Sequence, residues 1–210
     1  MSRLITLLVV VVLLALPAGA AVITFEGLAD NTAVPSGFYS GIGISSITGA
    51  TSFIASASGG SVPFANMPSP TTAILAASPG GAVFNVPGGF TSSATVLYAA
   101  DGSFNAVQVF AGLDGTGTLL GSSTTLADNM SGCNAGANPG DPGCWTLRTV
   151  TWAGTALSIK LPGNASTFYY DDLTLNITSV GGVPEPASVA TVAIGLLGGL
   201  LWRRRALRRQ

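Results

Sequence analysis

The body of this 210-residue chain predicts an all-β fold, an antiparallel β-sandwich of jelly-roll-like type. Apolar and polar residues alternate over short stretches, which is the period of a strand with one buried face. Turn residues separate these stretches, as at residues 113–117 and at Pro87-Gly88-Gly89. Residues 21–182 show no sustained helical period, so we expect two antiparallel sheets that share one core.

The strands are expected where β-branched, aliphatic or aromatic residues stand between turn residues. Strict alternation is clearest at residues 173–178, and residues 157–161 repeat it. Further strands are predicted at residues 21–25, 82–86, 94–99, 104–111 and 146–152. Residues 56–70 are rich in Ser, Gly and Pro and predict a long surface loop that lays Val62, Phe64 and Met67 on the core.

Residues 1–20 have the features of a secretory signal peptide. Arg3 supplies the positive start, and residues 4–16 form an apolar run. That run is shorter than the ~17 to 25 residues that span a bilayer as a helix. Ala18 and Ala20 fit the small-x-small pattern of signal peptidase, so we expect cleavage after Ala20 and export of residues 21–182.

The charge of the exported body excludes one class of partner. Residues 21–182 contain two basic residues, Arg148 and Lys160, against eight acidic ones, a formal charge of −6. A domain with so few cations cannot neutralise a nucleic-acid backbone. Nucleic-acid binding is therefore not expected.

The composition changes abruptly after residue 182. Residues 183–186 read Val-Pro-Glu-Pro, residues 187–202 are apolar, and residues 203–209 are rich in arginine. The prolines hold the chain extended, where a protease can grip it, and the apolar segment is long enough to span a thin or locally thinned bilayer as a transmembrane helix. The arginines would stop further translocation and remain in the cytoplasm. These predictions assign the sorting motif to Pro184, Glu185 and Pro186 and the membrane stop to Arg203, Arg204 and Arg205.

Residues 183–210 resemble the PEP-CTERM sorting domain of exported proteins in Gram-negative bacteria that make extracellular polysaccharide. The resemblance implies processing by exosortase, a membrane-embedded cysteine transpeptidase. The chain would sit in the inner membrane before processing and at the cell surface or in the extracellular matrix afterwards. A plain tail-anchored protein with a Pro-rich linker is the alternative. The predicted function is a non-catalytic, exosortase-sorted surface or matrix protein, and the alternative is a carbohydrate-binding module that associates with exopolysaccharide.

Catalysis is not expected in the body. The chain has no histidine to serve as the base of a hydrolytic triad. A carboxylate pair drawn from Glu26, Asp171 and Asp172 could in principle cleave a glycosidic bond, but a structural role is the simpler interpretation. We therefore predict that the protein is not an enzyme.

The two cysteines, Cys133 and Cys144, flank a loop rich in Asn, Gly and Pro. An exported chain meets an oxidising compartment, where such a pair normally forms a disulfide. With no histidine in the chain, two cysteines cannot supply the four ligands of a structural zinc site. A bridged loop is the prediction.

The body also resembles small β-sandwich ectodomains that carry this kind of tail, through residues 23–28 and 168–173. In carbohydrate-binding sandwiches of similar layout, carboxylates of the first and last strands often hold a structural calcium ion. Carried over, the ligands would be Glu26 with Asp171 or Asp172, since calcium prefers carboxylate oxygen. By alternation Asp171 points to the core and needs a partner, which could be backbone N–H groups, Lys160 or a cation.

Glycan binding would use an aromatic side chain that stacks on a sugar ring. Trp145, beside Cys144 in a Gly/Pro-rich segment, is the preferred candidate. The other aromatic candidates are Tyr39, Tyr98, Trp152, Tyr169 and Tyr170.

Overall fold

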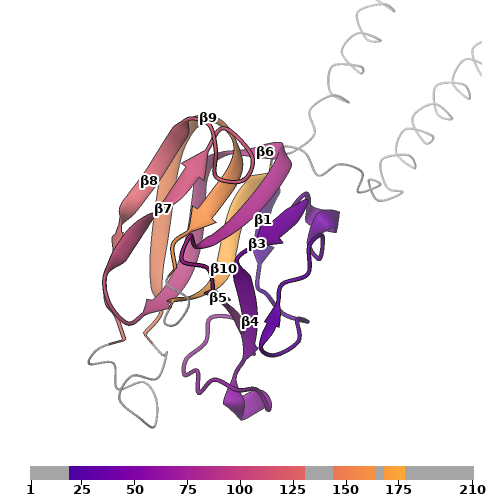
Figure 1. Ribbon diagram of the computed structural model, residues 1–210, viewed down its shortest axis with the longest axis vertical. Helices are drawn as coiled ribbons and strands as arrows, with labels where there is room; N and C mark the ends of the chain where they lie inside the picture. The colour runs from indigo at the N-terminus through magenta and orange to yellow at the C-terminus, as the bar shows by residue number, and fades with distance from the viewer. Residues whose placement is uncertain (1–18, 131–143, 164–167, 178–210) are drawn as a thin grey trace, which may run out of the picture. The chain divides into compact units, whose positions relative to one another are not determined.

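The computed structural model describes residues 19–130, 144–163 and 168–177, and these residues form an all-β structure (Figure 1). Every pairing between named strands is antiparallel, which confirms the predicted class. The elements are β1 (Gly19–Ile23), β2 (Thr32–Ala33), η1 (Ser40–Ile42), β3 (Ser46–Thr48), β4 (Ala50–Ile54), η2 (Ser56–Ser58), β5 (Thr72–Ala76), β6 (Ala82–Ala100), β7 (Phe104–Phe110), β8 (Leu119–Leu126), β9 (Thr146–Leu161) and β10 (Phe168–Ile177).

Hydrogen bonds link the strands in the order β2-β4-β5-β10-β6-β9-β7-β8, with β1 also on β10 and β3 also on β6. The long strands β6 and β9 change neighbours along their length. The first part of β6 pairs with β3, and its second part pairs with β10. Strand β8 then lies across the first part of β9, where a Cβ at Gly121 would come within 2.9 Å of the Thr151 carbonyl oxygen. The continuous ladder thus folds back on itself into a sandwich-like arrangement, while the jelly-roll assignment stays a prediction.

One large apolar core lies between these strands, and its fully buried aromatic side chains are Phe25, Phe84, Phe90, Tyr98, Phe168 and Tyr170. A smaller cluster is built on Ala55, Phe64 and Ala73, with Val62 and Met67 packed against it. The loop predicted at residues 56–70 therefore lays its apolar residues on buried structure, as expected.

The turn predicted at Pro87-Gly88-Gly89 is wrong. These residues lie inside β6, which joins the two strands expected at residues 82–86 and 94–99. The pairing of β6 with β9 shifts register between Asn85 and Phe90. A bulge tolerates a proline, which cannot donate a ladder hydrogen bond, so the turn-forming residues bend the strand without ending it.

The predicted strands at residues 146–152 and 157–161 are likewise parts of one strand, β9. Gly154, between them, has φ 87°. A glycine adopts this backbone conformation without the steric cost that other residues incur. The irregularity therefore bends the strand without dividing it.

Strand β1 begins two residues before the expected signal-peptide cleavage point. Gly19 and Ala20 pair with Ile177 and Asn176, and the register continues to Ile23 opposite Leu173. Cleavage after Ala20 would leave the pairs of Ala21, Val22 and Ile23 in place. The rest of the signal peptide and the tail from residue 183 lie outside the described residues, among which no helix is long and apolar enough to cross a membrane.

Candidate functional site

Three acidic residues from opposite ends of the chain come together where β1 ends beside β10. The pairing of Ile23 with Leu173 brings Glu26, three residues after β1, close to Asp171 and Asp172. Glu26 itself lies in a turn that follows the first strand. Strand β10 has one extra residue relative to β6 between Asp171 and Thr174, and Asp172 has φ 47°. The bulge redirects the chain at this carboxylate pair.

Asp171 is fully buried, as the alternation predicts. Its Oδ2 accepts hydrogen bonds from the Ser69 backbone N–H (3.0 Å) and the Ser69 hydroxyl (2.6 Å). Its Oδ1 accepts one from the Asp172 backbone N–H (2.8 Å). Burial raises the pKa of Asp171 from 3.8 to about 6, although these hydrogen bonds favour the ionised form. The predicted partner of the buried carboxylate is thus a set of N–H and O–H donors.

Glu26 is held in a similar way by the segment that opens β5. Its Oε1 accepts from the backbone N–H groups of Thr71 and Thr72, both at 2.9 Å, and its Oε2 accepts from the Thr71 hydroxyl. Burial acts to raise the pKa of Glu26, but the hydrogen bonds outweigh it, so that pKa is lowered. The sequence Ser69-Pro70-Thr71-Thr72 supplies the donors to both carboxylates. These donors were not predicted from the sequence, although the run of hydroxyl residues was the available signal.

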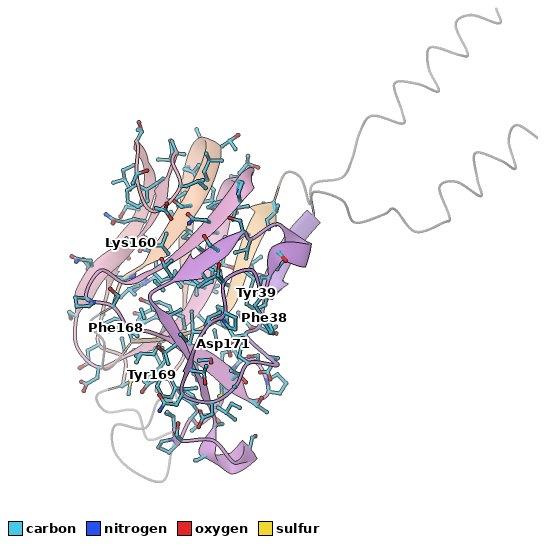
Figure 2. The ribbon with its side chains drawn as sticks, turned by 45° about the vertical axis from the view of Figure 1, so that its right-hand side comes forward. Phe38, Tyr39, Lys160, Phe168, Tyr169 and Asp171 are labelled. Atoms are coloured by element: carbon cyan, nitrogen blue, oxygen red, sulfur yellow. The ribbon has the colours of Figure 1, made fainter. Side chains whose placement is uncertain are left out.

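An aromatic pair lies next to these carboxylates. The rings of Phe38 and Tyr39 meet edge to face with centroids 4.9 Å apart, and Tyr39 also packs on Phe25. Burial raises the pKa of Tyr39 strongly, and the charges of Glu26 and Asp171 add to this effect. The Tyr39 hydroxyl is buried without a hydrogen-bond partner among the described residues. Figure 2 shows Phe38 and Tyr39 in the region of Asp171, and Lys160 elsewhere on the molecule.

Phe38 is the exposed member of this group, with 46% of its surface accessible. The sequence contained no signal that separated it from the buried phenylalanines. Phe38 and Tyr39 thus form an aromatic edge beside the carboxylate of Glu26.

The carboxylates do not fit a calcium site as they stand. Calcium needs six to eight oxygen ligands, whereas the oxygens of Glu26 and Asp171 already accept hydrogen bonds from protein donors. Within residues 19–130, 144–163 and 168–177, no group of three or more His, Cys, Asp or Glu side chains is placed to hold a metal ion. The calcium hypothesis gains no support from this arrangement.

Trp145 lies away from these carboxylates, on the smaller apolar cluster. Its indole Nε1–H donates to the Ala65 carbonyl oxygen (3.2 Å), and its ring packs on Phe64 with centroids 5.9 Å apart. These contacts tie the 56–70 loop to the start of β9. Glycan contact by the partly buried Trp145 stays a prediction.

Two of the other aromatic candidates lie in the core, and two more are partly buried. Tyr98 and Tyr170 are fully buried in the core, so the prediction is wrong for them. Tyr170 donates its hydroxyl to the Pro162 carbonyl oxygen (2.6 Å). Trp152 packs on Phe90, and Tyr169 packs on Phe53 and Phe64.

Several predicted residues lie outside the described part of the chain. They are Cys133, Pro184, Glu185, Pro186, Arg203, Arg204 and Arg205. The Cys133–Cys144 disulfide therefore stays a prediction.

Comparison with known families identifies the tail. The family of the PEP-CTERM protein-sorting motif matches residues 182–205. The match includes Pro184, Glu185 and Pro186 together with the three arginines at 203–205, so the sorting-motif prediction is confirmed. This motif defines a class of exported proteins that carry a C-terminal sorting signal. Among curated proteins, none matches the sequence.

Two solved structures show similarity to the body. One is a β-1,3-glucan binding CBM6 from Bacillus halodurans, at 16% identity and a TM-score of 0.38, covering 62% of this chain and 87% of that chain. The other comprises the CBM22-1-GH10 modules of the Clostridium thermocellum N-terminal endo-1,4-β-D-xylanase 10B, at 13% identity and a TM-score of 0.31. It matches 55% of this chain, which spans 23% of that structure.

Proposed function

We propose that this chain is a non-catalytic exported protein that exosortase sorts and processes through Pro184-Glu185-Pro186. The sorting motif at residues 182–205 carries the proposal. Signal peptidase acts first at the N-terminus, and residues 187–202 then hold the body at the inner membrane. Processing delivers the all-β body to the cell surface or to the extracellular matrix of a Gram-negative bacterium.

The test is the fate of the tail in a host with active exosortase. Glu185→Ala should leave an unprocessed chain in the inner membrane, and deletion of exosortase should do the same to the native chain. Asp101→Ala, which changes an exposed acidic residue of the body, is the matched control and should be processed normally. If mass spectrometry finds Trp202 in the native protein of both hosts, the chain is a plain tail anchor and the proposal is wrong.

Association with exopolysaccharide is the second candidate function. It is favoured by the exposed ring of Phe38, which packs on Tyr39 beside Glu26. An aromatic ring stacks on the apolar face of a sugar, and carboxylates accept hydrogen bonds from its hydroxyls. Because proteins bearing such tails are exported, the matrix polysaccharide of the cell is the ligand we infer.

Retention on purified exopolysaccharide tests this second function. Phe38→Ser should reduce retention of the exported protein, since it removes the exposed ring. Leu119→Ser is the matched control, because Leu119 is 47% exposed on the edge strand β8. Equal retention of both variants, with unchanged melting temperatures, would rule out Phe38 as the contact.

A further inference from the structure

A second polar site lies around Lys160, away from Asp171 and Phe38 (Figure 2). The pairing of β7 with β9 sets Gln108 directly opposite Lys160, so their side chains share one face of the sheet. The two residues line a pocket of about 70 Å³ together with Asn105, Pro79, Gly80 and Gly163. One water molecule requires only ~10 to 15 Å³ by this measure, so the pocket accommodates a larger polar group.

The polar side chains of this pocket have unused hydrogen-bonding capacity. Within the described residues, the side chains of Asn105, Gln108 and Lys160 make no hydrogen bond or ion pair. Asp114 belongs to the turn that packs near the Lys160 stem, yet its carboxylate accepts from Asn85 Nδ2 at 2.6 Å. The amides of Asn105 and Gln108 carry two N–H donors each and the Lys160 ammonium carries three, so seven donors face solvent until a ligand accepts from them.

The contrast with Arg148 makes Lys160 distinctive. These two residues are the basic residues of a body that carries eight acidic ones. Arg148 is engaged: its guanidinium lies 5.5 Å from the centre of the Tyr98 ring, and Nη2 donates to the Tyr98 hydroxyl (3.3 Å). The cation that faces a pocket is therefore Lys160, which leaves it available for an anion.

The walls of the pocket are held by close backbone packing. A Cβ at Gly163 would lie 2.3 Å from the Ala76 carbonyl oxygen, and one at Gly81 would lie 2.2 Å from the Leu161 carbonyl oxygen. The loop after β5 and the end of β9 thus approach as closely as glycine allows. A pocket with such walls needs little reorganisation to bind a ligand.

We propose that Lys160, Gln108 and Asn105 form a binding site for the carboxylate and neighbouring hydroxyls of one uronic acid unit in an acidic polysaccharide. The ammonium pairs with the carboxylate, and the two side-chain amides both donate to and accept from hydroxyls. The proposal rests on the proposed export, because only an exported body meets such a polymer. It does not depend on Phe38, which belongs to the other site.

Calorimetric titration of the full chain in mild detergent tests the proposal. The probes are trigalacturonate, the neutral galactose trimer and inorganic phosphate. Trigalacturonate should bind, and Lys160→Met should weaken that binding about tenfold or more, since a charge-assisted hydrogen bond is lost. Lys160→Arg should stay within about threefold of the native chain, and Gln108→Glu should abolish binding by supplying an internal partner to Lys160.

Arg148→Met is the matched control, because it removes the other cation of the body, and it should leave trigalacturonate binding unchanged. The proposal is overturned if Lys160→Met binds trigalacturonate like the native chain, or if the neutral trimer binds equally well. If inorganic phosphate binds as tightly as trigalacturonate, the pocket binds anions without selecting uronic acids, and the proposal is likewise overturned. A negative titration does not bear on the proposed sorting by exosortase, because processing of the tail is measured separately.

Discussion

Replacing the buried carboxylate of Asp171 should change how the stability of the body depends on pH. The folded state raises the pKa of this group from 3.8 to about 6, so it holds the proton more tightly than the unfolded state does. The resulting stabilisation is fully present below pH 3.8 and is lost as the pH rises through about 6. A shift of this size corresponds to about 3 kcal/mol.

Asp171→Asn removes the titrating group and keeps the shape of the side chain. It also places an amide N–H against a backbone donor, which is expected to cost about 1 to 3 kcal/mol at every pH. Relative to the native chain, the free energy of unfolding of the variant should therefore increase by about 2.4 kcal/mol between pH 4 and pH 7, because part of the effect is already lost at pH 4. The constant packing cost cancels from this comparison of slopes.

Guanidinium unfolding of the exported protein, followed by tryptophan fluorescence at several pH values, measures the effect. The reasoning is refuted if the native chain and Asp171→Asn give parallel profiles from pH 4 to pH 7. That result would mean that Asp171 does not titrate differently in the folded and unfolded states.

Three further predictions concern the same body. Ser69→Ala removes the hydroxyl bonded to Asp171 and should lower the free energy of unfolding at pH 7 by about 1.5 to 3 kcal/mol in guanidinium titrations, whereas no loss would show that the hydroxyl is dispensable. Gly163→Ala should lower the free energy of unfolding by about 1 to 3 kcal/mol in the same titrations, because the added Cβ would clash with Ala76. Gly41→Ala is the control: its Cβ would enter open space, so the free energy of unfolding should change by less than about 0.5 kcal/mol. Addition of calcium or of a chelator should leave the melting temperature unchanged, since protein donors already satisfy the carboxylates of the site; a rise of several degrees with calcium would instead support a structural ion.

The sequence predicted the class of the fold because the alternation is strong in the strands that face one core. It missed β5, whose residues Thr72–Ala76 are all buried and therefore show no alternation. It also missed β8, Leu119–Leu126, because its polar and small residues are common in loops. This segment is a strand because it pairs with β7, although its own residues have low strand propensity.

Of the site around Asp171, the sequence predicted only the three carboxylates. The resemblance to carbohydrate-binding sandwiches, in which carboxylates of the first and last strands often hold calcium, is why Glu26 and the Asp171-Asp172 pair were expected to meet. The donors of Ser69 and Thr71 reach these carboxylates across 102 and 45 residues of sequence, and no local pattern reveals such contacts. The exposure of Phe38 likewise depends on how its loop packs, which composition does not encode.

The pairing of β1 with β10 has a consequence for secretion. Strand β1 leaves the membrane first, yet its hydrogen-bonding partner arrives about 150 residues later, at Leu173 opposite Ile23. Under the proposed export, the earliest part of the body has an unpaired edge until then, and closing so long a loop slows folding. In such an export, the body can complete its sheet only when almost all of it has been translocated, so its first strand would need protection from pairing with other chains throughout that interval.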